Sequence, residues 1–370
     1  SDVKQMTFTK TKALFPDKID LLLFDVTTLY FESVEVDELR NFGYSKDHRF
    51  NTTQVVLALA TNQDGLPIGY ELFEGNKAEV TTLVAAIESW KSLFTIDSVC
   101  FVGDRAMFTN KNMELLESKN YHYIIAAKLR KLPGSLQDTL FDESHYRPTV
   151  LNDEFGWVGE FDYQGRRLIV SYKSKRAMKD QHERQQVINK LQKRIGKKGN
   201  PNNLITNQGV KKFVTRDENA SIAIDENKIE ADGQWDGLHG VMTNIKDDSP
   251  QSLIARYARL WVIEESFRVN KHTLRMRPIF HWKPERIHAH IAICYMTFSV
   301  LRHLQYRINL TQKISIDEIL DELLNVQASI YIHKETKDRY RVPGSFSNNA
   351  RKIYKAFDLE RSLDAAVHLP

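Results

Sequence analysis

A chain of 370 residues, 42% of them hydrophobic and 27% charged, suits one large domain with an insertion or two domains, and excludes a disordered, fibrous or small disulfide-bonded protein. Its two cysteines each lie inside an apolar run, which excludes a cysteine-based zinc site and favours a reducing compartment. The formal net charge is only +4, so any binding site for a polyanion must come from local clustering of basic residues.

The first predicted elements are three strands. Residues 21–28 form an apolar run typical of a strand buried on both faces, and one carboxylate, Asp25, interrupts it. Residues 53–60 and 67–73 predict two further strands joined by an Asp-Gly hairpin turn, which completes an antiparallel meander. A carboxylate in such a run costs several kcal/mol to bury unless it is paired or holds a cation, so we expect Asp25 to be a ligand.

Helices and strands then alternate. Apolar residues up to position 90 recur at helical spacing, residues 98–103 predict a fourth strand, and a second helix precedes a fifth strand over 121–127. The order β-β-β-α-β-α-β predicts an α/β sheet with antiparallel and then parallel strands. The fourth strand ends on Asp104, which, taken alone, is better explained as a solvated residue or a helix cap.

Residues 132–248 have a different pattern. Their short alternating segments are typical of an antiparallel β region with one solvated face, so we expect an inserted domain. Within it, residues 174–198 predict a helix with many more basic than acidic residues. A solvated charged face is the alternative, but the excess of one sign favours DNA contact, with Lys190, Lys193, Arg194 and Lys197 as candidates.

A long helix without Gly or Pro is predicted over residues 252–271. Tyr257, Glu264 and Lys271 are spaced seven and seven, so they share one face of a continuous helix. Arg268 follows Glu264 by four residues, and an ordinary surface ion pair between the two is an equally good interpretation.

A second helix is predicted over residues 284–306, and it contains the longest apolar stretch, 291–301. That stretch is well short of the roughly 20 residues that a membrane span requires, so we expect no membrane segment. No apolar signal region follows Ser1, so we expect a cytoplasmic protein whose natural chain extends further upstream.

The acidic residues suggest a metal site. If the fourth strand lies beside the first, Asp25 and Asp104 converge, and Glu264 from a helix packed on the sheet completes a cluster of three carboxylates. Hard oxygen ligands of this kind suit Mg²⁺ or Mn²⁺. Two such ions about 4 Å apart promote in-line attack on a phosphodiester, so the predicted reaction is phosphoryl transfer.

These residues resemble a known family. The strand with Asp25, the Val-Gly-Asp-Arg turn at 102–105, the β-rich insertion and the Tyr-Ala-Arg-Leu-Trp-Val-Ile-Glu segment ending at Glu264 are similar to the DDE transposases of bacterial IS4-type insertion sequences. Residues 275–290 resemble the subgroup typified by IS1634. The resemblance implies a ribonuclease-H-like fold, a mixed sheet with helices interrupted by the β-rich insertion domain.

The resemblance also implies roles for single residues. Asp25, Asp104 and Glu264 fall on the catalytic triad, which binds Mg²⁺, with Mn²⁺ as a substitute, while Tyr257 and Lys271 fall on residues that hold the terminal phosphates of the transposon end. Arg105 and Arg268 are further predicted DNA contacts beside the triad. The family's signature Arg belongs three residues after the Tyr, where this chain has Leu260, so Arg259 or Arg256 substitutes or the contact is lost.

In better-known members an insertion Trp stacks on a flipped base and permits a DNA hairpin intermediate. Here either Trp235 or His239 stands near the corresponding position, and each ring can stack on a base. A core role for Trp235 is at least as good an interpretation, so the sequence leaves the hairpin route open.

The predicted domains are residues 1–131 and 249–310 for the catalytic core, 132–248 for the insertion, and 311–370 for a C-terminal helical tail. The predicted function is cut-and-paste transposition on double-stranded DNA, at transposon ends and target, by a homodimer assembled on the DNA in the bacterial cytoplasm. The family's N-terminal domain for recognising the ends is expected to be missing or incomplete. The alternatives are a metal-dependent nuclease without strand transfer and a non-catalytic DNA-binding relative.

Overall fold

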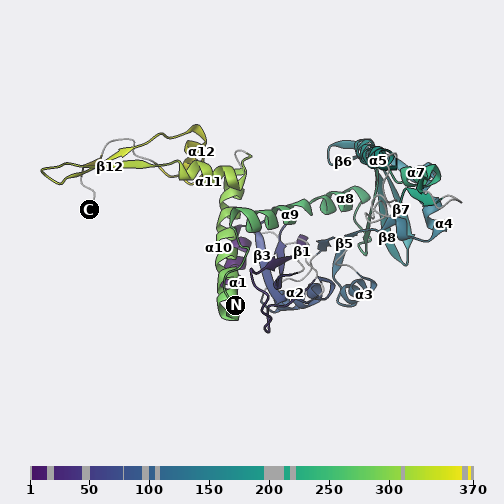
Figure 1. Cartoon of the computed structure of the whole chain (residues 1–370), viewed down its shortest axis with the longest axis horizontal. Helices are drawn as coiled ribbons and strands as arrows, with labels where there is room; N and C mark the ends of the chain where they lie inside the picture. Colours follow the sequence, from purple (N-terminus) through teal and green to yellow (C-terminus); the bar gives the residue numbers. More distant parts are fainter. Residues whose placement is uncertain are drawn as a thin grey trace. The chain divides into compact units, whose positions relative to one another are not determined.

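The computed structural model (Figure 1) consists of two compact units, Ser1–Phe101 with Arg259–Pro370, called unit 1, and Val102–Ala258, called unit 2. The residues that it describes are 2–14, 21–43, 51–77, 79–93, 100–104, 109–195, 212–216, 222–309, 313–360 and 366–367.

Unit 1 contains the predicted meander. Strands β1 (Leu21–Tyr30), β2 (Gln54–Thr61) and β3 (Pro67–Glu74) pair antiparallel in the order β3-β2-β1. Every residue of β2 is buried, as expected for a strand covered on both faces. The hairpin between β2 and β3 turns at Gly65, whose φ of 81° is easily adopted only without a side chain.

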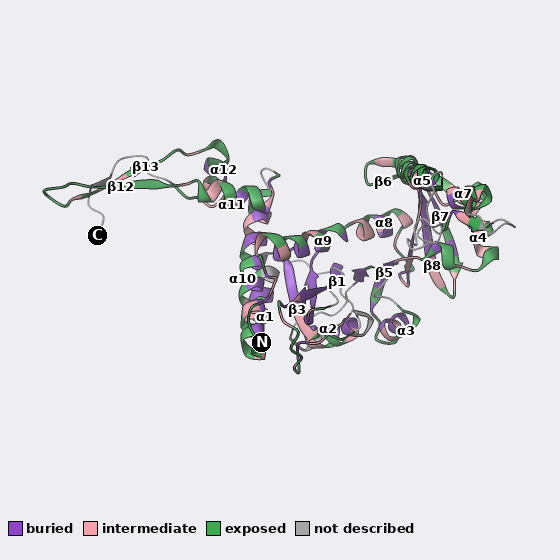
Figure 2. Cartoon of the chain, in the orientation of Figure 1, coloured by how far each residue is buried: buried purple, intermediate pink, exposed green. Residues whose placement is uncertain are grey.

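Helices cover this meander. The α1 helix (Asp2–Leu14) and the α10 helix (Pro284–Asn309) pack against β3, the α2 helix (Glu79–Leu93) packs against β2 and β3, and the α9 helix (Trp261–Arg268) packs against β1 and β2. Buried residues are concentrated on the strands and on the inward faces of the helices (Figure 2). The core of unit 1 therefore lies on both sides of the meander.

Unit 2 is built on a second run of strands. These follow the order β5 (His122–Ala126), β11 (Leu238–Thr243), β8 (Arg166–Tyr172), β7 (Glu154–Tyr163) and β6 (Tyr146–Leu151). A two-stranded sheet of β9 (Val214–Arg216) and β10 (Ile222–Ile224) lies apart from that run in the strand pairing. The described helices of unit 2 are α3 (Asn110–Ser118), α4 (Gly134–Phe141), α5 (Ser174–Ile195), α7 (Glu226–Gly233) and α8 (Pro250–Ala258). Two short 3-10 turns, η1 (Leu129–Lys131) and η2 (Glu143–His145), accompany them.

The strand β4 (Cys100–Gly103) stands between β1 and β5 in the order of one nine-stranded sheet. This arrangement confirms the predicted fold class of a mixed α/β sheet with helices. The insertion continues that sheet, because β11 pairs antiparallel with β5 on one side and β8 on the other. The domain boundaries drawn from the sequence differ from the two compact units and stay a prediction.

The prediction of one continuous helix over residues 252–271 is wrong. The α8 helix ends at Ala258, α9 starts at Trp261, and a π-helical turn, η4 (Val269–Thr273), follows. Around the break the backbone makes short bonds across three residues, from the Val262 N–H to the Arg259 carbonyl and from the Ile263 N–H to the Leu260 carbonyl. Tyr257 and Glu264 therefore do not lie on one continuous helix.

The prediction of a helical C-terminal tail also needs correction. The α11 helix (Ile316–Leu324) and the α12 helix (Asn348–Ala356) are present, but a three-stranded sheet accompanies them. Its strands are β12 (Ala328–Ile332), β13 (Arg339–Pro343) and β14 (Ala366–Val367). The physical reason is composition, since β12 and β13 contain β-branched and aromatic residues that favour extended backbone.

Candidate active site and nucleic-acid contacts

Asp25 lies in the middle of β1 with fully buried residues on both sides along the strand, opposite Leu59 of β2. Its own side chain is only half-buried, and Oδ1 accepts a hydrogen bond of 2.7 Å from the backbone N–H of Val26. The residue is therefore partly accessible to solvent, and its role as a metal ligand stays a prediction.

Glu264 lies on α9, the helix that packs against β1, and its side chain is exposed. Among the described residues its carboxylate has no hydrogen-bond or ion-pair partner. The adjacent Glu265 is engaged instead, because its Oε2 accepts a hydrogen bond of 3.1 Å from Arg302 Nη2. Helix α9 thus carries one structural carboxylate and one that is available to a ligand.

Arg268 does not form the alternative ion pair with Glu264. Its Nη2 lies 3.7 Å from Glu265 Oε1, and its Nη1 lies 3.3 Å from Asp317 Oδ2. The side chain is half exposed, so these pairs are individually weak. Contact of Arg268 with DNA stays a prediction, and a DNA phosphate would compete with these two ion pairs for the guanidinium.

Asp104 is exposed and follows the last residue of β4 directly. Arg105, predicted as a DNA contact, lies outside the described residues. Within the described part of the chain, no group of three or more His, Cys, Asp or Glu side chains is arranged to hold a metal ion. The donor chemistry fits Mg²⁺ or Mn²⁺, since all three predicted ligands are carboxylates and each is exposed or half-buried.

Lys271 lies in the π-helical turn and is half-buried, with its Nζ 6.0 Å from the ring centre of Phe267. We expect Lys271→Ala to weaken DNA binding and to lower the slope of log K against log salt by about one, because one phosphate contact is removed. Titrations of a labelled duplex at several salt concentrations measure this slope. Lys352→Ala, at an exposed position on α12, serves as the control, and an unchanged slope for Lys271→Ala would contradict the role.

Two predicted DNA contacts touch each other within unit 2. The His239 ring on β11 lies 5.2 Å from the Tyr257 ring on α8, measured between ring centres. Both side chains are half-buried, and α8 packs against β5 and β11. A strand residue and a helix residue that are far apart in sequence therefore form one aromatic cluster.

Trp235 is packed within unit 2 rather than presented freely. Its ring meets the edge of Phe141 at 4.7 Å between centres, and the Arg130 guanidinium lies 5.5 Å from the ring centre. Trp235 also packs against the buried cluster that contains Leu129 and Leu140, as in the core alternative considered for it. Base stacking by Trp235 stays a prediction.

The basic helix divides its charges between two faces. Lys190 and Lys193 are exposed, whereas the Arg184 side chain is only 11% exposed and donates to Asp236 at 2.5 and 2.6 Å. The side chain of Arg194 and the whole of Lys197 fall outside the described residues. The excess positive charge expected from the sequence is thus partly neutralised by acids that lie elsewhere in the chain.

Arg259 lies in unit 1, where it lines a cavity of about 680 Å³ with Asp64 and Trp261. Burial raises the pKa of Asp64, and the nearby Arg259 guanidinium opposes that rise. Arg259 is exposed, so it is accessible to a DNA phosphate as predicted from the signature.

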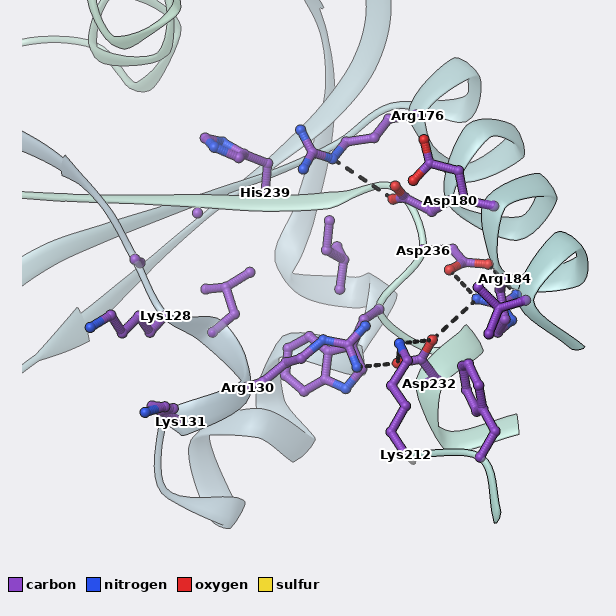
Figure 3. Close-up of a pocket in the computed structure, with 18 residues that line it drawn as sticks. Lys128, Arg130, Lys131, Arg176, Asp180, Arg184, Lys212, Asp232, Asp236 and His239 are labelled. Carbon is purple, nitrogen blue, oxygen red and sulfur yellow. Dashed lines mark hydrogen bonds and ion pairs between the residues drawn. The ribbon is translucent and has the colours of Figure 1, made fainter. Parts of the chain in front are cut away.

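A feature that sequence reasoning missed is a cavity of about 730 Å³ in unit 2, here called the Asp232 cavity (Figure 3). Asp232 is only 8% exposed, and it receives hydrogen bonds from Arg130 at 2.5 Å and from Lys212 at 3.0 Å. Arg184 Nη1 lies 3.8 Å away. Burial raises the pKa of Asp232, but the bonds from Lys212 and Arg130 outweigh it and the pKa is lowered.

Among the described helices, none has both the length and the apolar character to cross a lipid bilayer.

Comparison with known proteins gives a family match. A family model described as Transposase DDE domain matches residues 16–299, which include Asp25, Asp104 and Glu264. No curated protein sequence matches the chain. Among solved structures it is similar to "Mos1 transposase paired-end complex with left transposon end", with 14% identity and a TM-score of 0.20 over 33% of this chain and 40% of that chain. The chain therefore spans less than half the length of that transposase chain.

Proposed function

Since the chain belongs to the Transposase DDE domain family, we propose that it is a cut-and-paste transposase that cleaves transposon ends and joins them to target DNA. The observation that carries the proposal is Glu264, an exposed carboxylate without a described partner on the helix that packs against the strand of Asp25. The family match over three quarters of the chain supports the same assignment.

The proposed ligands of a Mg²⁺ or Mn²⁺ pair are Asp25, Asp104 and Glu264. When bound, such ions activate a water or a 3′-hydroxyl and stabilise the leaving oxygen of a phosphodiester. Asp25 lies in β1 and Glu264 lies on α9, the helix packed against β1, which supports the proposal that both carboxylates serve one site. Tyr257 and Lys271 are proposed to hold the terminal phosphates, and His239 to support the ring of Tyr257.

The proposed partner is double-stranded DNA, bound as transposon ends and as target by a homodimer that assembles on it. Membership of the IS4-type group and a bacterial cytoplasmic location are parts of the same proposal, and they rest on the signature around Glu264 and Lys271. Each of these points is open to direct measurement.

The test uses a pre-cleaved DNA end carrying the element's own terminus, a supercoiled target plasmid, and Mg²⁺ or Mn²⁺. We expect covalent joining of the 3′-hydroxyl end to the plasmid, because the same triad serves hydrolysis and strand transfer. Cleavage of intact ends without joining would favour the nuclease alternative. Absence of both reactions with either metal would contradict the proposal.

A further inference from the structure

The turn η1 lies at the edge of the Asp232 cavity and is anchored by one apolar side chain. The Ala127 N–H donates to the Gly240 carbonyl at 2.8 Å, which extends the pairing of β5 with β11 up to the turn. Leu129 then enters the core beside Leu140, while Lys128, Arg130 and Lys131 stay exposed. The glycine opposite leaves room for this anchor, because a Cβ on Gly240 would lie 2.5 Å from Leu129 Cδ2 and Leu129 would have to shift.

The uncompensated charge of the cavity is concentrated on this turn. Six cationic side chains and four carboxylates line the cavity. Arg130 and Lys212 bind Asp232, Arg184 binds Asp236, and Arg176 lies 3.8 Å from Asp180. The two cations that remain are Lys128 and Lys131, whose ammonium groups have no hydrogen-bond or ion-pair partner in the described part of the chain. Figure 3 shows both extending away from Asp232, whereas Arg130 turns toward it.

The turn also lies at a defined edge of the sheet. The helix α3 connects β4 to β5, which are neighbours in the strand order, and a helical crossover between neighbouring strands joins parallel strands. Asp104 follows β4 directly, and Lys128 follows β5 by two residues. The turn therefore lies at the sheet edge that carries Asp104.

We propose that Lys128, Arg130 and Lys131 form a phosphate-binding ridge that contacts the backbone of one DNA strand at the sheet edge of Asp104. This proposal deepens the proposed function, because it names a DNA contact of that same site. Arg130 uses one of its five donors on Asp232 and retains others for a phosphate, so Asp232 acts as its positioning residue. A polyanion engages the ridge better than a single anion, since each neutralised phosphate releases condensed counterions.

The experiment compares the full chain with Lys128→Ala/Lys131→Ala and with a matched control, Lys352→Ala/Lys355→Ala, which removes the same charge from exposed positions on α12. Binding of a labelled DNA duplex is measured at several salt concentrations. We expect the ridge variant to lose about two units of the salt slope and to bind at least tenfold more weakly at low salt. The control retains the parental slope, and both variants retain the parental melting temperature.

Further arms identify the ligand. The same variants are titrated with inorganic phosphate and with an RNA duplex. We expect the ridge variant to lose no more affinity for either of these ligands than it loses for the DNA duplex. The proposal would be overturned if the ridge variant kept the parental salt slope for DNA binding. It would also be overturned if the variant lost affinity only for phosphate or only for RNA. If the parental protein binds DNA through the ridge but never cleaves or joins it, the proposed function fails while the ridge stands.

Discussion

Replacing Glu264 by Gln is expected to lower the rate of DNA cleavage by about 10³-fold or more, a loss of about 4 kcal/mol of transition-state stabilisation. The amide keeps the size of the side chain but removes the charge that a divalent cation requires. Because Glu264 is exposed and has no partner in the described residues, the substitution leaves folding unchanged. DNA affinity measured without metal should stay within about twofold of the parent.

The matched control is Glu285→Gln, the same substitution at an exposed position in the first turn of α10. It should cleave at the parental rate. Cleavage is followed on a labelled transposon end in Mg²⁺ and again in Mn²⁺. Retention of cleavage by Glu264→Gln in either metal would remove Glu264 from the triad.

The parts of the fold that were predicted correctly depend on local sequence. The strand around Asp25 shows as an apolar run, and the β2–β3 hairpin shows as an Asp-Gly turn at Gly65, because both signals are contained within a few neighbouring residues. The helix break between Ala258 and Trp261 has no such signal. It contains neither Gly nor Pro, and the chain buries Ile254 in unit 2 before the break and Ile263 in unit 1 after it.

The Asp232 cavity was missed for a related reason. Arg130 and Asp232 are 102 residues apart, and their meeting depends on the pairing of β5 with β11 across the whole insertion. The sequence indicates a basic helix, but it does not indicate that Asp236 neutralises Arg184 on that helix. Long-range charge pairing is set by strand register, which composition and periodicity do not specify.

Asp232→Asn is expected to lower the free energy of unfolding by about 2 kcal/mol at neutral pH. The substitution leaves three cations around a buried amide, but Arg130 and Lys212 are about half exposed, so water offsets part of the cost. Urea unfolding followed by tryptophan fluorescence measures the difference, and Trp235 beside Arg130 reports on this region. Asp247→Asn, at an exposed position in the same unit, is the control and should unfold like the parent.

The pH dependence of the free energy of unfolding gives an independent check on the role of the Asp232 charge. Because the pKa of Asp232 is lowered in the folded protein, its contribution is complete above the unfolded pKa of about 3.9 and is lost as pH falls through the folded pKa. The difference between parent and Asp232→Asn should therefore be constant from about pH 5 upward and shrink in acid below about pH 4. A difference in the free energy of unfolding that persists undiminished in acid would mean that Asp232 acts through packing. Asp232 would then not be the electrostatic support of Arg130 on which the phosphate-binding ridge depends.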